Sequence, residues 1–333
     1  MKALVDTKDF NLTGTYPFRQ GKVRDIYDLG EHLLFIATDR VSAFDHVLPT
    51  PIPGRGIMLT TMTVKCCDYL RSTIEQLDIG FPVLDHIVST NIADLPPEFQ
   101  KFAKELQGRF MIVDKHTPIP VELILRGNIS GSFWKEYLLA LAESNTDPVM
   151  VHGHPMPRDL KESQAFPEIL FTPSTKAPKG EHDKNINFDQ MTTIIRDWLK
   201  DGEFSDQVDA EQLANACREL TVTIFTKARE YTEEHGIIIP DTKFELALAM
   251  VNGVPTIVII DEVLTSDSSR YWPADEFEVG RSQNSFDKQI IREYLEKIGW
   301  NKQAPAPPLP SEIVDRVVAR YKECIDLLFP KTA

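Results

Sequence analysis

Short stretches in the first part of the chain alternate apolar and polar residues with a period of two, the pattern of half-buried strands. Strands are predicted at 16–18, 22–28, 33–37, 83–88, 110–114 and 121–126. A stiff loop between Pro49 and Gly56 leads into a predicted helix at 57–76. The pattern therefore predicts an antiparallel sheet in the N-terminal part of the protein.

Helical periodicity dominates the rest of the chain. Helices are predicted at 133–142, 188–200, 209–235, 286–298 and 310–328, and a short helix opens at 96–98. The segment 145–181 has many prolines and little periodicity, and a loop of that length is usually either functional or disordered. Its Thr172-Pro173-Ser174-Thr175-Lys176 run and the following His182-Asp183 favour function.

This order of elements predicts an α+β fold. We expect a smaller β-rich domain at 1–117 over a larger α/β domain at 118–333 that ends in helices. A cleft between two such domains is the usual place for a ligand.

The most regular alternation belongs to a predicted hairpin of 240–251 and 254–262, joined by the two-residue turn Asn252-Gly253. One face of its first strand carries only apolar side chains, which are Phe244, Leu246, Leu248 and Met250. The opposite face carries Asp241, Lys243 and Glu245. Burying these charges is costly unless they are paired or hold an ion.

The second strand of the hairpin ends in two carboxylates. A two-residue turn places Glu245 opposite Ile260, so regular alternation puts Glu262 on the side of Glu245 and Asp261 on the other side. Asp261 can face Glu245 only if the strand bulges or ends before it. Glu245 with Asp261 or Glu262 could hold Mg²⁺, which takes carboxylates together with phosphates. The alternative is a structural salt bridge to Lys243.

Composition and charge limit the possible partners. The chain has 333 residues, of which 42% are hydrophobic and 26% charged, values that are ordinary for a globular protein. With 36 Lys+Arg against 50 Asp+Glu, the formal net charge is -14, which argues against nucleic acid or an anionic membrane as a partner. An anionic ligand must therefore be held by local clusters of cations and backbone N–H groups.

Neither a membrane span nor a leader is predicted. No apolar run approaches the roughly 18 residues that a membrane helix needs, and the first residues lack the apolar core of a signal peptide. We therefore expect a cytoplasmic protein. The four cysteines, Cys66, Cys67, Cys217 and Cys324, lie in helical patterns and are expected to be buried thiols rather than metal ligands or disulfides.

Two N-terminal segments have the composition of ligand-binding loops. Gly21-Lys22-Val23-Arg24-Asp25 places two cations on one face of a predicted strand beside a glycine, which suits a polyphosphate, although an exposed basic strand would look the same. In Asp39-Arg40-Val41-Ser42-Ala43-Phe44-Asp45, three ionisable groups and a hydroxyl leave the end of an apolar strand, either as part of a site or as a capped surface turn.

Two later segments could bind a phosphate monoester. Arg126 ends a strand shortly before Ser130-Gly131-Ser132, where a helix begins; Ser132 and the free N–H groups there suit a phosphate, unless these serines only cap the helix. Ser266-Asp267-Ser268-Ser269-Arg270 again sets hydroxyls beside an arginine, or forms a solvated loop. In an acidic chain, these clusters and the carboxylates of the hairpin fit a nucleotide with an anionic co-substrate.

Six motifs carry a family resemblance: GKVRDIY, DRVSAFD, PVELILRGNISGSFWKEY, TPSTKAPKGEHD, DTKFELAL and IIDEVLTSDSSRYW. In this order and at these separations, over 14–300, the chain resembles the phosphoribosylaminoimidazole-succinocarboxamide synthases (SAICAR synthetases) of purine biosynthesis. The resemblance implies an ATP-binding half similar to those of protein kinases and ATP-grasp enzymes. It also implies a ligase that joins L-aspartate to carboxyaminoimidazole ribonucleotide while ATP becomes ADP and phosphate.

The resemblance also implies roles for residues. Expected contacts of ATP are Lys22, Arg24, Asp114, Lys115, Lys243 and Glu245, and expected magnesium ligands are Glu245 and Asp261. Expected contacts of the other substrates are Asp39, Ser42, Arg126, Ser132, Lys176, His182, Ser269 and Arg270. Lys22 and Lys243 would offset charge on the phosphoryl group during its transfer, and Asp45 and Asp183 are candidates for the general base.

The expected chemistry explains why ATP is needed. Oxide is a very poor leaving group, so the carboxylate must first become an acyl phosphate, which the aspartate amine then attacks. Two alternatives use the same residues: a small-molecule kinase, which product analysis with and without aspartate would separate, and a non-catalytic nucleotide-binding regulator, which would need eroded motifs. We expect a monomer, with a homo-oligomer as the alternative.

Overall fold

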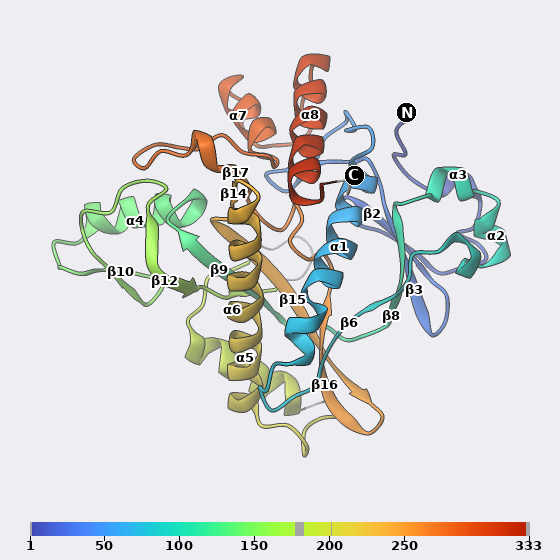
Figure 1. The fold of residues 1–333 in the computed structure, drawn as a ribbon, viewed down its shortest axis with the longest axis horizontal. Coiled ribbons are helices and arrows are strands. Elements are labelled where there is room, and N and C mark those ends of the chain that lie inside the picture. Colours follow the sequence, from blue (N-terminus) through green and yellow to red (C-terminus); the bar gives the residue numbers. More distant parts are fainter. Residues whose placement is uncertain (1, 177–182, 201, 331–333) are drawn as a thin grey trace.

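The computed structural model describes residues 2–176, 183–200 and 202–330, and two sheets form its frame (Figure 1). The smaller sheet is antiparallel. Its strands, in spatial order, are β1 (Phe18–Gln20), β2 (Arg24–Asp28), β3 (His32–Ala37), β8 (Phe110–Asp114) and β7 (Ile87–Ser89). The predicted N-terminal sheet and the predicted α+β class are thus confirmed.

The two faces of the smaller sheet differ because side chains alternate along each strand. Tyr27, Leu34 and Ile36 pack on one face against Phe99 of α2 (Pro97–Gln100) and Leu106 of α3 (Ala103–Leu106). The alternate residues of β2 and β3 face the larger sheet. This second face forms one wall of a cleft.

The larger sheet carries the predicted hairpin. Its spatial order is β12 (Ala165–Phe171), β9 (Val121–Asn128), β15 (Asp241–Val251), β16 (Val254–Ile260) and β6 (Val83–Asp85), and β13 (Ser174–Thr175) also pairs with β9. Neighbouring strands are antiparallel, except that β6 runs parallel to β16. A strand from the N-terminal part of the chain therefore completes the larger sheet.

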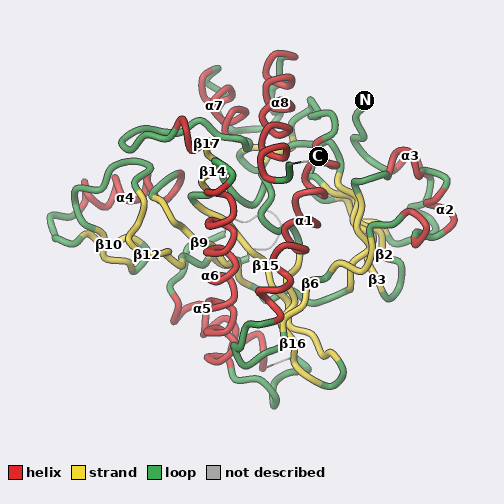
Figure 2. The backbone as a smooth tube through the Cα atoms, viewed as in Figure 1, coloured by secondary structure: helices red, strands yellow, loops and turns green. Residues whose placement is uncertain are grey.

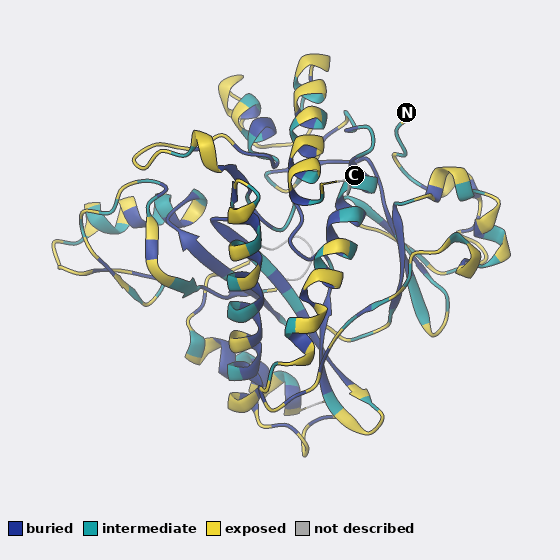
Figure 3. Ribbon diagram, viewed as in Figure 1, coloured by how far each residue is buried: buried dark blue, intermediate teal, exposed yellow. Residues whose placement is uncertain are grey.

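Long helices cover one face of this sheet. They are α1 (Arg55–Glu75), α5 (Phe188–Lys200) and α6 (Ala210–Glu234), and α8 (Ser311–Leu328) packs beside α1 (Figure 2). Phe244, Leu246 and Leu248 of β15 lie in this main core, as predicted, whereas Met250 near the turn is exposed. Figure 3 shows the strands buried behind helices whose outer faces are exposed.

The remaining elements surround this frame. They are the helices α4 (Gly131–Glu143) and α7 (Gln289–Lys297), the strands β4 (Ser42–Ala43), β5 (His46–Val47), β10 (Val149–Val151), β11 (His154–Met156), β14 (Ile237–Ile238) and β17 (Trp272–Pro273), and the 3-10 turns Lys8–Phe10, Ile92–Asp94 and Ala274–Glu276. None of the helices in the described part combines the length and the apolar character that crossing a bilayer requires.

Three predictions about secondary structure need correction. The predicted strand 83–88 divides into β6 and β7, which join different sheets. Lys22 does not share a strand with Arg24, because β2 begins only at Arg24. The segment 145–181, expected to be a long loop, contains the short strands β10, β11, β12 and β13 in its described part.

The hairpin register is as predicted: Glu245 lies opposite Ile260 and Val251 opposite Val254. The second strand ends at Ile260, and Asp261 takes a left-handed backbone conformation with φ of 66°. Strand alternation therefore stops before the first carboxylate, which was the condition for Asp261 to face Glu245. The four cysteines are free, and all but the half-buried Cys66 are buried, as expected.

Candidate active site

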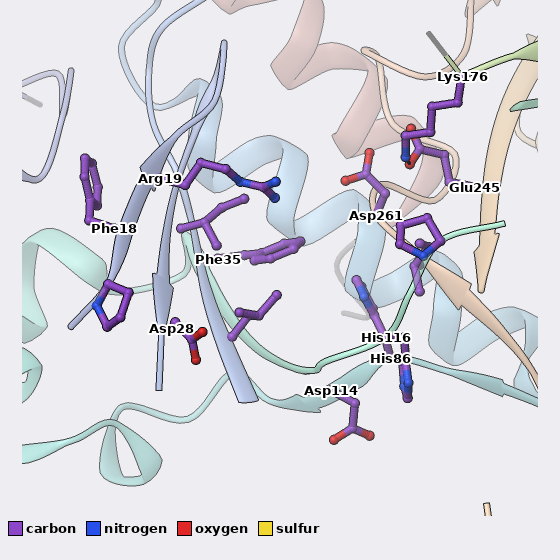
Figure 4. A pocket seen from close by; sticks show the side chains of 15 residues that line it. Phe18, Arg19, Asp28, Phe35, His86, Asp114, His116, Lys176, Glu245 and Asp261 are labelled. Atoms are coloured by element: carbon purple, nitrogen blue, oxygen red, sulfur yellow. Dashed lines mark hydrogen bonds and ion pairs between the residues drawn. The ribbon is translucent and has the colours of Figure 1, made fainter. Parts of the chain in front are cut away.

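A cleft of about 460 Å³ lies between the two sheets (Figure 4). Ile26, Leu33 and Phe35 of the smaller sheet and Ile260 of the larger sheet supply apolar walls. The polar lining consists of Arg19, Asp28, His86, Asp114, His116, Lys176, Glu245 and Asp261. The cleft thus offers a flat apolar space with carboxylates at one end, and we call it the nucleotide cleft.

Two ion pairs occupy the carboxylate end of the nucleotide cleft. Lys176 pairs with Glu245, and the guanidinium of Arg24 pairs with Asp261 (Figure 4 shows Lys176, Glu245 and Asp261 together). Burial opposes ionisation of Asp261, but the charges of Arg24 and then Lys243 outweigh it and lower the pKa of this carboxyl. Asp261 is therefore held as an anion next to Glu245.

Glu262, the alternative partner of Glu245, is placed differently. It is buried, and its Oε2 accepts a hydrogen bond of 2.6 Å from the Thr265 hydroxyl. Burial raises its pKa even though Arg24 opposes that shift. The geometry and the charge of the two groups therefore favour Asp261 over Glu262 as the carboxylate that acts with Glu245.

A second pocket of about 290 Å³ lies further along β15, and we call it the anion pocket. Arg126 lies in β9, two residues before its end at Asn128, and Arg270 lies in the segment after β16. Both pair with the buried Asp241, and the Arg126–Asp241 distance is 3.3 Å. Ser132 of α4 and Ser269 also line this pocket. The structure thus brings together four of the predicted substrate-binding residues.

Gly131 allows Arg270 to reach this position. Its φ of 58° favours glycine, and a Cβ at this residue would lie only 2.3 Å from Nη2 of Arg270. Ser130 precedes α4, but its side chain accepts no hydrogen bond from the backbone N–H groups of the helix; its hydroxyl instead donates to Asp241 at 3.4 Å. Ser130 thus stands at the N-cap position of α4, but its hydroxyl bonds to Asp241 rather than capping the helix.

Further charged residues line the anion pocket: Asp267 of the 266–270 motif, and Asp287, Lys288 and Arg292, which the sequence analysis did not single out. Lys288 and Arg292 project into it from the start of α7, and Asp267 pairs with both Lys288, at 3.5 Å, and the fully buried Arg55. The spacing of Lys288 and Arg292 could have identified them as a pair, since residues four apart share one face of a helix. Nothing in the local sequence indicated that Arg55 would reach Asp267.

Lys243 lies between the two pockets on the face of β15 that also carries Asp241 and Glu245. Its Nζ is 2.5 Å from Glu122 of β9 and 3.5 Å from Glu245. Burial acts to lower the pKa of Lys243, but these two carboxylates outweigh it and raise that pKa. Glu122, another residue that the sequence reading missed, has a raised pKa because its burial outweighs the attraction of Lys243.

The carboxylates of the cleft are compatible with magnesium. In the described part of the chain no cluster of three or more His, Cys, Asp or Glu side chains could hold a metal by itself. Glu245 and Asp261 nevertheless line the same end of the nucleotide cleft. Mg²⁺ commonly binds through one or two carboxylates with water and substrate phosphates completing its shell, so two ligands fit.

Two predicted contacts of ATP, Lys22 and Lys115, are not among the residues that line the nucleotide cleft. Lys22 is exposed and pairs with Asp45 at 2.6 Å, and Lys115 pairs with Asp28 at 2.6 Å. Asp114 does line the nucleotide cleft. Arg24 is half-buried at the carboxylate end of the cleft, where it pairs with Asp261, so the two cations of the first motif have different surroundings.

Asp39 differs from the other predicted substrate contacts. It is fully buried, and its carboxylate accepts hydrogen bonds from the backbone N–H groups of Leu4, at 2.9 Å, and Gly56, at 3.0 Å, and from Arg109, at 3.1 Å. These contacts favour a structural role. Ser42 lies half-buried in β4, close in sequence to Asp45.

The central segment reaches the site from the opposite side. Its Lys176 lines the nucleotide cleft, and the exposed Asp183 contributes to the raised pKa of Glu122. His182 lies outside the described residues. Lys176 and Lys243 thus meet the carboxylates of Glu122 and Glu245 where the two pockets adjoin.

The SAICAR synthetase family model matches residues 17–307 of this chain. The phosphoribosylaminoimidazole-succinocarboxamide synthase of Geobacter sulfurreducens is 43% identical over 320 residues, which cover 96% of this chain and 95% of that protein. The protein of the same name from Geobacter metallireducens is 44% identical over 306 residues, which cover 92% of each. The similarity therefore extends through every element that contributes to the two pockets.

Solved structures show the same likeness. The SAICAR synthase of Saccharomyces cerevisiae, complexed with SAICAR, is 36% identical with a TM-score of 0.78, covering 100% of this chain and 99% of that one. A SAICAR synthetase in complex with ADP has a TM-score of 0.59 at 18% identity, with coverage of 95% and 99%; this second likeness concerns the fold alone.

Proposed function

Because this chain belongs to the SAICAR synthetase family, it is an ATP-dependent ligase of purine biosynthesis, and we propose that it activates its ribonucleotide substrate as an acyl phosphate. The reaction joins L-aspartate to the carboxylate of carboxyaminoimidazole ribonucleotide. The proposal assigns ATP to the nucleotide cleft and the ribonucleotide to the anion pocket.

Several features support ATP in the nucleotide cleft. Ile26, Leu33 and Phe35 form apolar walls that suit a purine base, and Asp114 lies at the rim where the smaller sheet ends. The related SAICAR synthetase named above was solved with ADP. The phosphates would then run toward Arg24, with Lys22 and Lys115 approaching from the rim.

The anion pocket suits the phosphate of the ribonucleotide. Arg126, Arg270 and Ser132 converge there, and a guanidinium can donate two parallel hydrogen bonds to phosphate oxygens. Lys288 and Arg292 add positive charge on the α7 side. In this pose the imidazole carboxylate points along β15 toward Lys243.

The first step transfers a phosphoryl group between the two pockets. A carboxylate oxygen of the ribonucleotide attacks the γ-phosphorus, the bond from that phosphorus to the β-phosphate oxygen breaks, and ADP leaves. Lys243 offsets negative charge on the transferring group, while Glu122 and Glu245 hold its ammonium in place. Lys176 is positioned to add a second cation if it leaves Glu245.

Glu245 and Asp261 would hold magnesium at this point. When bound, the ion neutralises phosphate charge and orients the γ-phosphoryl group. The lowered pKa of Asp261 supports its role as a ligand, because a metal requires the ionised carboxylate.

The second step forms the amide. The amine of aspartate attacks the acyl carbon, the carbon–oxygen bond to phosphate breaks, and the amine loses a proton. Asp45, which lines a neighbouring polar pocket with Ser132 and Arg270, and Asp183, beside Glu122, are the candidates to accept that proton.

One observation carries the proposal: β15 presents Asp241, Lys243 and Glu245 on one face, so that a single strand joins the anion pocket to the carboxylate end of the nucleotide cleft. Ribonucleotide labelled with ¹⁸O in its carboxylate should transfer one label to inorganic phosphate. ADP release should require both aspartate and the ribonucleotide. Unlabelled phosphate in a complete turnover would reject the acyl phosphate.

A further inference from the structure

Arg19 lies on the wall of the nucleotide cleft, and none of the roles described above involves it. It lies on β1, directly opposite Ile26 of β2, which in turn lies opposite Phe35 of β3. Residues in such a cross-strand row project from the same face of a sheet. All three line the cleft, so the side chain of Arg19 extends the apolar wall with a cation.

Arg19 has no charged partner among the described residues of the cleft. The lining includes four carboxylates, Asp28, Asp114, Glu245 and Asp261, but only two permanent cations, Arg19 and Lys176. Lys176 pairs with Glu245. Within the described residues, Arg19 has neither an ion pair nor a side-chain hydrogen bond.

The direction of the side chain indicates what it would bind. In Figure 4, Arg19 extends from β1 into the cleft and points toward the end where Asp261 and Glu245 lie. Along the strands, this places it between the rim residue Asp28 and the half-buried Arg24. A nucleotide whose base lies near the rim would have its first phosphates at this level.

We propose that Arg19 binds the phosphates of the nucleotide, as an additional cation that closes over the cleft from the edge strand. This inference rests on the assignment of ATP to the nucleotide cleft. The cations at the carboxylate end of the cleft, Arg24 and Lys176, already pair with Asp261 and Glu245. Arg19, in contrast, pairs with no carboxylate among the described residues, and its guanidinium can donate two hydrogen bonds to a polyphosphate.

The competing explanation is that Arg19 protects an edge strand. A charged side chain on an edge discourages pairing with another chain, and β1 is at the edge of its sheet. In that case Arg19 would affect solubility or self-association and leave nucleotide affinity unchanged. The two explanations therefore differ in a binding measurement.

The test compares Arg19→Gln with Lys104→Gln in the full chain. Lys104 is exposed on α3, behind the opposite face of the same sheet, so both variants lose one surface charge from the same region. The dissociation constants of magnesium ADP and magnesium ATP are measured by calorimetry at low and high salt. Adenosine, measured by competition with a fluorescent ADP analogue, serves as the probe without phosphates.

The proposal predicts that Arg19→Gln weakens ADP and ATP by about tenfold at low salt, the effect of losing one charged hydrogen bond. This loss of ADP and ATP affinity should be smaller at high salt, because salt screens a solvent-accessible charge. Adenosine affinity should stay within about twofold, and Lys104→Gln should bind all three ligands as the parent protein does.

Two results would overturn the inference alone. Parent-like ADP affinity in Arg19→Gln would remove Arg19 from the site, and an equal loss for adenosine would exclude the contact with phosphate. Failure of the parent protein to bind ATP or ADP would instead contradict the assignment of ATP to the nucleotide cleft. The two failures are therefore distinguishable.

Discussion

The nucleotide cleft and the anion pocket share the strand β15 but are built on different principles. The cleft combines apolar walls with ion pairs at its surface, in which Lys176 pairs with Glu245 and Arg24 with Asp261. In the anion pocket, the buried Asp241 is shared by Arg126 and Arg270. In the nucleotide cleft the two cations pair with different carboxylates, whereas in the anion pocket one carboxylate pairs with two arginines.

The difference follows from what each site must bind. A purine base is recognised largely by shape and apolar contact, while its phosphates arrive with a metal ion that must compete for carboxylates. A phosphate monoester needs cations that are already oriented, because orientation during binding would cost affinity. Lys243, which lies at the junction, belongs to both sites, and loss of this residue should have the largest effect.

Lys243→Met should reduce kcat about 1000-fold, the upper range for removing one preorganised charge from a transition state. Affinity for each separate substrate should change much less, because each pocket keeps its other contacts. Steady-state kinetics of aspartate-dependent ADP release would measure this. Lys227→Met, which removes a surface lysine paired with Glu230 at 2.7 Å, is the control. A kcat within tenfold of the parent value would remove Lys243 from the junction.

Glu245→Gln should lower turnover about 100-fold and raise the magnesium concentration needed for half-maximal activity. Glu262→Gln tests the alternative ligand and should leave that requirement nearly unchanged, because Glu262 faces Thr265. Circular dichroism would confirm that both variants are folded. The opposite pattern, with the magnesium requirement altered only in Glu262→Gln, would reverse the assignment of the metal ligand.

Arg270→Met should raise KM for the ribonucleotide about 100-fold, since it removes a charged group from the proposed phosphate site. KM for ATP should stay within about threefold, which would show that the two pockets bind separately. Arg281→Met, which removes an exposed arginine paired with Glu278 at 2.8 Å, is the control. Equal increases in both KM values would contradict the expectation that the two pockets bind their ligands separately.

The nucleotide cleft contains a buried histidine, and the anion pocket has none among its described lining residues. Burial, with a smaller effect of Arg24, lowers the pKa of His86 from 6.5 to about 4. Below pH 6.5 the unfolded chain binds a proton that the folded protein excludes, so this contribution to stability is complete above pH 6.5 and falls as the pH drops toward 4.

Between pH 7 and pH 5 this histidine should cost about 2 kcal/mol of unfolding free energy. Urea denaturation of the parent and of His86→Gln at both pH values would measure it, and the variant should lose about 2 kcal/mol less than the parent over that interval. Identical pH dependence in the two proteins would mean that His86 is protonated in the folded state.

Local patterns predicted the hairpin well, because one two-residue turn determines the register of every residue between Glu245 and Ile260. Strand alternation alone assigned Asp261 to the wrong face. Asp261 reaches the site because β16 ends at Ile260 and Asp261 has a positive φ, and in this position it pairs with Arg24 from the other sheet. Such long-range contacts leave no periodic signal.

The absence of a local signal for long-range contacts also explains why the sequence analysis missed some residues of the site. Glu122 looked like one polar position in a buried strand, and its meaning depends on Lys243, which is 121 residues away in sequence. Arg55 and Asp267 are similarly remote from each other. Motifs identified the loops that carry the chemistry, whereas the carboxylates that orient the cations became visible only in three dimensions.

The parallel pairing of β6 with β16 has a consequence for synthesis of the protein. The ribosome completes β6 long before it completes β16, and the apolar side of α1 likewise waits for α6 and α8. A nascent chain ending near residue 117 would lack α6 and α8, so Met62, Leu70 and Ile74 would have only part of the core that surrounds them in the folded protein. The nascent protein therefore depends on its last-made segments, and chaperones should bind the emerging α1 until α8 leaves the ribosome.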